Sequence, residues 1–232
     1  MTRASIAFVA LVMSSAALAG CSDDAPATSS STLSFTYVGR GEDGYIDQVV
    51  SISYSGSSAV VPLVEYTALD ADGDALPEVT VTTAFGSDRQ LLLVAPGGSI
   101  DVLQFDGPGA DKVEGVRSEV MKSTSAALTE TDTVIAVTPF DAAGTEVTKF
   151  DPFTEVMLDN PYSTAVHVRV VCLIYDTPAE GRPEQASEIT ELLPRVELAV
   201  GASTGFPIGA AVAQMFADRG LACHSLKAHL TP

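Results

Sequence analysis

Alternating aspartates are the first residues of this sequence whose spacing could do chemistry. Asp70, Asp72 and Asp74 stand at every second position, and Glu78 follows four residues later. Calcium takes six to eight oxygen ligands, and carboxylates in a turn supply several of them. The spacing departs from that of an EF-hand, because Gly73 stands fourth in the run instead of sixth. Two interpretations stay open: a calcium site formed by these four side chains, or, favoured here, an acidic hairpin with Gly73 in a left-handed conformation.

A serine between glycines is the second candidate. Gly201–Gly205 matches the pattern G-x-S-x-G, with Ser203 at the position of a hydrolase nucleophile. Such a serine needs an acid and a histidine from later strands, and only 27 residues follow Gly205. The pattern therefore favours an ordinary turn, and a small serine hydrolase is the weakest of the functions considered.

The N-terminus has the features of an export signal. Arg3 precedes an apolar run over residues 4–18, and small residues follow it, as in secretory signal peptides. The string Leu18-Ala19-Gly20-Cys21 resembles the lipobox of bacterial lipoproteins. The resemblance implies a signal peptide over residues 1–20 and a diacylglycerol thioether on Cys21, whose two acyl chains anchor a protein stably. Residues 21–32 would then be the lipidated cysteine and a flexible tether.

Two further cysteines remain once Cys21 is assigned to the lipid. Cys172 and Cys223 are an even pair in a compartment that the signal makes oxidising, so we expect a disulfide between them. The alternative is a metal site that adds His224, but no CxxC spacing supports it. His224 and His229 are five residues apart and would face opposite sides of a strand. With His167, they are expected to be surface or interface histidines.

Charge and composition exclude several classes of protein. The chain has 232 residues, of which 46% are hydrophobic and 18% charged, which is typical of a folded protein and not of a disordered one. Asp and Glu number 30 against 12 Lys and Arg, a net charge of −18, so no nucleic-acid partner is expected. The acidic stretch from Asp101 to Glu114 is interrupted by Gly107-Pro108-Gly109 and is predicted to be a solvated loop.

Short β-branched or alternating segments, separated by turn residues, predict β-strands throughout the body. The expected strands are 48–54, 60–69, 79–83, 90–94, 133–138, 166–175 and 196–200. One helix is predicted over Ile208 to Arg219, with Gly220 as its stop. Ala126-Ala127 and their neighbours are interpreted as a linker.

A weak internal repeat suggests two copies of one module. Residues 57–60 (SSAV) align with residues 163–166 (STAV) at an offset of 106. In the second copy, Met157-Leu158-Asp159-Asn160-Pro161 precedes the strand that ends in Tyr175-Asp176, and this phrase resembles extracytoplasmic bacterial Ig-like modules. The resemblance implies adhesion, scaffolding or binding units without catalytic residues.

These patterns predict a mostly β protein with two tandem Ig-like or fibronectin-III-like β-sandwich domains. The domains would span 33–128 and 132–232, with the short helix in the second. The expected function is that of an extracytoplasmic protein, lipid-anchored to the bacterial cell membrane, acting as a non-catalytic interaction or structural module for an envelope protein partner. No cofactor is expected. The alternative is an envelope lipoprotein that binds calcium or a small ligand.

Overall fold

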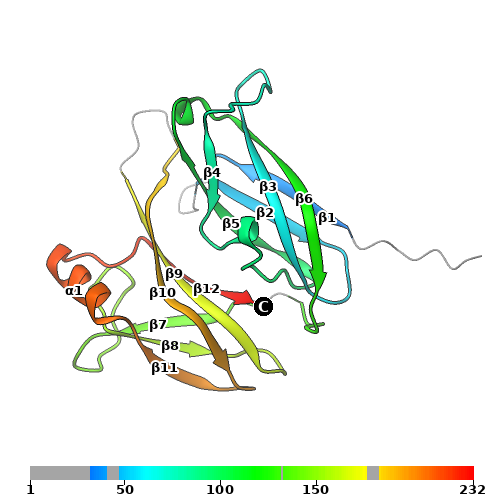
Figure 1. Ribbon diagram of the computed structural model, residues 1–232. Helices are drawn as coiled ribbons and strands as arrows, with labels where there is room; N and C mark the ends of the chain where they lie inside the picture. Colours follow the sequence, from blue (N-terminus) through cyan, green and yellow to red (C-terminus); the bar gives the residue numbers. More distant parts are fainter. Residues whose placement is uncertain (1–31, 41–46, 132, 177–182) are drawn as a thin grey trace, which may run out of the picture. The chain divides into compact units, whose positions relative to one another are not determined.

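The computed structural model describes residues 32–40, 47–131, 133–176 and 183–232, which are mostly β, as predicted (Figure 1). Of the strands in the described residues, six lie in the first half of the chain: β1 (Leu33–Val38), β2 (Val49–Tyr54), β3 (Val60–Leu69), β4 (Thr80–Thr83), β5 (Gly97–Asp106) and β6 (Gly115–Ser125). Another six lie in the second half: β7 (Ala136–Phe140), β8 (Glu155–Asp159), β9 (Val166–Tyr175), β10 (Ala186–Leu198), β11 (Ser203–Pro207) and β12 (Ser225–Thr231).

All strand pairs in the described residues are antiparallel, and their order repeats between the halves. The first half has the sheets β1-β2-β5-β4 and β3-β6, and the second has β7-β8-β11 and β10-β9-β12. β2 pairs with β5 as β8 pairs with β11, and β3 pairs with β6 as β9 pairs with β12. The halves differ in one strand, since β4 joins β5 whereas β10 joins β9.

The predicted strands correspond to the observed ones where alternation is regular. The segments 48–54, 60–69, 79–83 and 166–175 match β2, β3, β4 and β9 within a residue. The predicted strand 90–94 is wrong: only Val94 forms an isolated bridge, to Val60. The reason is local, because Gln90 has a φ of 56° and the left-handed backbone there interrupts an extended chain.

The helix α1 (Ala210–Arg219) lies where the sequence predicts it. Gly220 ends it in the left-handed conformation, and its N–H donates to the carbonyl of Phe216 at 2.9 Å. Phe216 is fully buried and packs against Phe153, with ring centroids 5.1 Å apart. Within the described residues, no helix is long and apolar enough to span a bilayer.

β9 buries side chains on both of its faces. Val168, Val170 and Cys172 point into the core of the second half. The alternate residues Val171 and Leu173 pack in a different hydrophobic cluster, whose other buried members come from the first half. A strand with two buried faces is flanked by a packed layer on each side.

The two halves also share hydrogen bonds. Gln104 Nε2 donates to the carbonyl of Ala186 at 2.9 Å, and Gln185 exchanges two bonds with the backbone of Phe105. The contacts group Ser31–Pro232 as one compact unit. Its division into domains at 33–128 and 132–232 stays a prediction.

The disulfide expected between Cys172 and Cys223 is present. The two sulfur atoms are 2.10 Å apart, and both residues are fully buried. Cys172 lies in the middle of β9, and Cys223 lies just before β12, the neighbouring strand. The bond therefore joins the segment that follows α1 to the strand shared by both cores.

Loss of this disulfide should destabilise the protein by about 4 kcal/mol, because the bond closes a loop of 51 residues in the unfolded chain. The change is the double substitution Cys172→Ala, Cys223→Ala, and the measurement is urea unfolding of oxidised parent and variant. A loss below about 1 kcal/mol would contradict this expectation. The unfolding free energy of the parent under reducing conditions provides the internal check.

Candidate functional site

The aspartate run forms a hairpin turn. Asp70 Oδ1 accepts the backbone N–H groups of Asp72 and Asp74, each at 3.0 Å. Gly73 has a φ of 83°, as the hairpin interpretation requires. Asp72, Asp74 and Glu78 are exposed. The only carboxylate drawn into the turn is thus already bonded to backbone donors.

The same turn occurs a second time without its extra acids. Asp141 Oδ1 accepts the N–H groups of Ala143 at 2.9 Å and Thr145 at 2.8 Å, and Gly144 has a φ of 76°. A turn of identical bonding with only one carboxylate indicates that the aspartate at its first position has a structural use.

The three histidines lie in separate surroundings. His167 Nε2 is 3.8 Å from Glu197 Oε2, and His224 Nδ1 accepts the backbone N–H of Tyr175 at 2.8 Å. His229 is buried, which differs from the surface position considered for it. Across the described parts of the chain, no three His, Cys, Asp or Glu side chains gather as a metal site.

Ser203 lies at the start of β11 and is exposed, paired opposite Asp159. Gly201 has a φ of 61° and belongs to the turn before the strand. This is the ordinary turn that the sequence favours, followed by a strand and not by a helix. Cys21, the expected lipidation site, lies outside the described residues.

Asp101 corrects the prediction of a solvated acidic loop. It lies within β5 and is fully buried. Its carboxylate accepts four hydrogen bonds: two from the backbone N–H and hydroxyl of Ser87, and one each from the N–H groups of Phe85 and Val102, at 2.7–2.9 Å. Burial raises the pKa of Asp101, and these four bonds oppose the rise. Tyr66 extends the network, with its hydroxyl 2.8 Å from Ser87 Oγ.

This network bonds residues 85 to 93, called the 85–93 loop here, to the first half of the chain. The second half contacts the same loop. The carbonyl of Phe85 accepts Arg169 Nη1 at 3.1 Å, and Arg169 also forms an ion pair with Glu191. The ring of Phe85 stacks on His229, with centroids 3.3 Å apart. β9 and β12 place Arg169 and His229 directly opposite each other. The loop is therefore fixed from both halves.

His229 is held in its neutral form. Its Nε2 is buried and has no hydrogen-bond partner among the described residues. Burial, followed by the positive charges of Arg169 and Lys227, lowers the pKa of His229 to about 3. A neutral ring between Phe85 and a cation is a packing element, and this geometry does not suit proton transfer.

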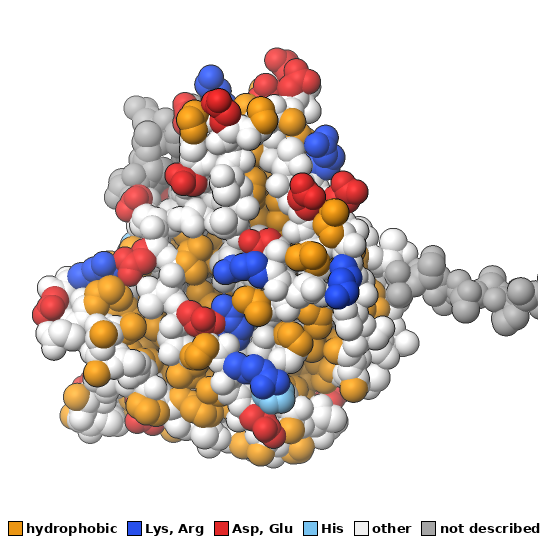
Figure 2. All heavy atoms as spheres, viewed as in Figure 1, with side chains coloured by type: hydrophobic (Ala, Val, Ile, Leu, Met, Phe, Trp, Pro, Cys, Tyr) orange, Lys and Arg blue, Asp and Glu red, His pale blue; other side chains and the backbone are white. Residues whose placement is uncertain are grey.

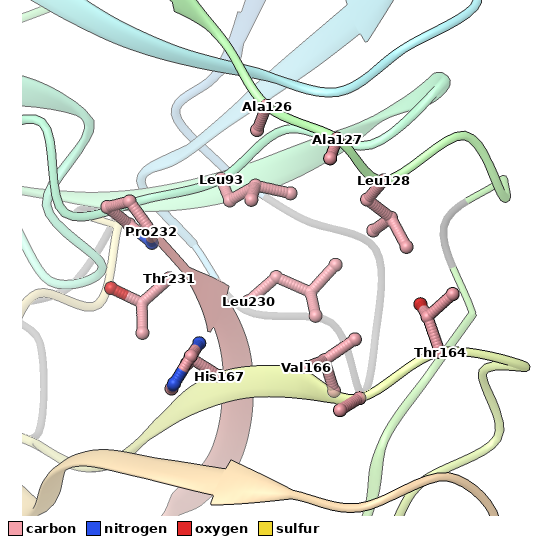
Figure 3. Close-up of a pocket in the computed structure, with 11 residues that line it drawn as sticks. Leu93, Ala126, Ala127, Leu128, Thr164, Val166, His167, Leu230, Thr231 and Pro232 are labelled. Carbon is pink, nitrogen blue, oxygen red and sulfur yellow. The ribbon is translucent and has the colours of Figure 1, made fainter.

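A hollow of about 270 Å³ opens where residues 126–128, residues 164–167 and the end of β12 meet (Figure 3). Apolar residues make up most of its wall: Leu93, Ala126, Ala127, Leu128, Ala165, Val166 and Leu230. The leucine and valine side chains point toward one another around the space, with His167 and Thr231 on one side and Thr164 on another. Pro232 completes the lining.

Backbone hydrogen bonds fix the walls of the hollow. Ala59 donates to the carbonyl of Leu128 at 2.6 Å and accepts the N–H of Ala126 at 2.7 Å. Leu93 donates to the carbonyl of Leu230 at 3.0 Å. The walls of the hollow are thus preformed, and a concave, mostly apolar lining is of the kind that receives a small molecule.

The hollow has no counterpart in the sequence patterns. Ala126 and Ala127 were interpreted as part of a linker. In the structure they line the hollow with small side chains. Leu93 comes from the 85–93 loop, while Val166 and Leu230 are ordinary strand residues. No motif links these positions, because they meet only in the folded chain. Asp101 had a usable signal, since it shares the inward parity of Leu103 and Phe105.

Comparisons with protein-family models, with curated proteins and with solved structures found no match to this chain.

The turn interpretation predicts different effects for neighbouring aspartates. Asp70→Ala removes the acceptor of two N–H groups and should lower the unfolding free energy by about 1–2 kcal/mol. Asp72→Ala keeps the backbone N–H that donates to Asp70, so the unfolding free energy should change by less than about 0.5 kcal/mol. Thermal and urea unfolding measure both. A calcium-induced rise in melting temperature that both variants abolish would instead support the metal interpretation.

The buried histidine predicts a dependence of stability on pH. The pKa of His229 is about 3 when folded and near its ordinary value of 6.5 when unfolded. The contribution of His229 to the unfolding free energy is complete above pH 6.5, and it falls by about 1 kcal/mol per pH unit as the pH drops toward 3. His229→Phe should remove this slope, measured by urea unfolding between pH 6.5 and 5, where few carboxylates titrate. The control His167→Gln should keep it, and an unchanged slope in His229→Phe would refute the assignment.

Proposed function

We propose that this protein is a lipid-anchored protein of the bacterial cell envelope, with a β body that acts as a non-catalytic interaction or structural module. The observation that carries the proposal is the sequence Leu18-Ala19-Gly20-Cys21 directly after an apolar run. An acylated Cys21 would attach the chain to the membrane, and the polar residues after it would separate the body from the lipid.

The buried disulfide supports an extracytoplasmic location. Structural disulfides form and persist in oxidising compartments and are rare in the cytosol. Cys172 and Cys223 are fully buried in a β core. The bond and the export signal are independent features of the chain, and both favour the envelope.

The architecture supports a rigid binding or scaffolding role. The halves share a hydrophobic cluster and the Arg169–Phe85 contact, and their contacts group them as one compact unit. The acidic body should be repelled by anionic lipid headgroups and is better suited to a protein partner than to the membrane surface.

The aspartate turn and Ser203 give less support to the two alternatives. Asp70 is bonded to backbone donors, and the other three acids of the run point to solvent. Ser203 begins an exposed edge strand opposite Asp159. The chemistry of these groups is accounted for by turns and strand pairing.

The substitution Cys21→Ala tests the proposal. The parent should incorporate labelled palmitate and gain the mass of an acylated N-terminus, whereas Cys21→Ala should gain neither and the neighbouring Ser22→Ala should behave as the parent. Crosslinking in the native envelope, followed by mass spectrometry, should enrich one envelope protein with the parent and lose it with Cys21→Ala. An unlabelled parent would refute the anchor, and a labelled parent without an enriched protein would refute the interaction role.

A further inference from the structure

We propose that the hollow bounded by Leu93, Leu128 and Leu230 binds a small uncharged apolar molecule that carries one hydrogen-bonding group. This inference goes beyond the proposed function, and it does not depend on the lipid anchor or on an envelope partner. Size, wall chemistry and the state of the charges at the rim each restrict the class of ligand.

Volume sets the size of the molecule. The hollow measures about 270 Å³. An apolar cavity of about 150 Å³ is enough for benzene. The space here therefore accepts a single ring with a short side chain, or an aliphatic molecule of about the same size, and is too small to enclose a nucleotide or a long acyl chain.

The walls favour an apolar body. Leu93, Val166 and Leu230 are nearly buried members of the main hydrophobic cluster, and Leu128 packs against the same cluster. These side chains have core residues behind them and the hollow in front (Figure 3). A ligand that covers them would remove apolar surface from water at about 25 cal/mol per Å². Because the backbone of this wall is hydrogen-bonded, binding would need little reordering.

The rim argues against an ionic ligand. His167 is the one titratable side chain among the described residues that line the hollow, and Glu197 lies 3.8 Å from it. Nearby, Arg195 Nε donates to the main-chain oxygen of Pro232 at 2.9 Å. Glu197 and Arg195 thus already have partners within the protein, and an ionic ligand would have to displace one of them. On the face of the protein that Figure 2 shows, acidic and basic side chains are interspersed, without a large field of one sign.

Hydroxyl groups supply the polar contact. Thr164 and Thr231 line the hollow on different sides, and each carries a group that can donate or accept. Thr231 is buried, at 5% exposure, so a ligand hydroxyl reaching it would be shielded from water. An alcohol or a similar neutral group matches these partners, and a charged group would lose hydration while the charged groups at the rim already have other partners.

Three probes of one shape separate these classes: 2-phenylethanol, phenylacetate and phenethylamine. Each probe is titrated calorimetrically into the full chain bearing Cys21→Ala. This background carries no lipid and needs no detergent, which would compete for the hollow. The protein is exported during expression so that the disulfide forms. We expect 2-phenylethanol to bind at one saturable site, at least tenfold more tightly than either ionic probe. Absence of saturable binding, or tighter binding of an ionic probe, would overturn the proposal.

Two substitutions at the exposed rim locate the site. Ala127→Leu and Ala165→Leu each add three carbon atoms at the edge of the hollow and should weaken 2-phenylethanol binding at least tenfold. Ala142→Leu, at an exposed position of the Asp141 turn, is the matched control and should bind as the parent does. Far-ultraviolet circular dichroism and melting temperature verify the fold of each variant. Undiminished binding by both folded rim variants would place the ligand elsewhere and refute the site.

Discussion

The structure depends on one strand that must satisfy two cores at once. β9 directs Val170 and Cys172 into the second half, and Val171 and Leu173 toward the first. Each fully buried aliphatic side chain stabilises the fold by about 1.5–3 kcal/mol, so the strand contributes to both layers. Arg169 is the exception on this strand, and its charge is tolerated because Glu191 and the carbonyl of Phe85 are its partners.

The 85–93 loop is bonded to both halves, and its last residue lines the hollow. Asp101 holds its first residues with four hydrogen bonds from inside the first half, and His229 stacks on Phe85 from the second. The loop ends at Leu93, whose N–H is bonded to β12 and whose side chain lines the hollow. One wall residue of the hollow, Leu93, thus comes from a loop whose first residues are held by a buried polar network.

Local patterns in the sequence predicted most secondary-structure elements, but they did not predict how these elements pack against one another. Regular alternation predicted β3 and β9, a glycine predicted the end of α1, and the even cysteine pair predicted the disulfide. Alternation shows that a strand has two faces, but it does not show that a distant segment covers the second face. That is why Arg169 and His229 could not be recognised as contacts between the halves, and why the hollow, assembled from four separate segments, was missed.

A strand shared by two cores also affects the order in which the chain can fold. When synthesis or export delivers the N-terminal part first, Phe85 and Leu92 are present long before Val171 and Leu173, the residues that cover their cluster. The apolar cluster of the first half stays exposed until β9 has been synthesised or exported, and β12 follows later still. During that interval the nascent chain is vulnerable to aggregation and offers a natural substrate to holding chaperones.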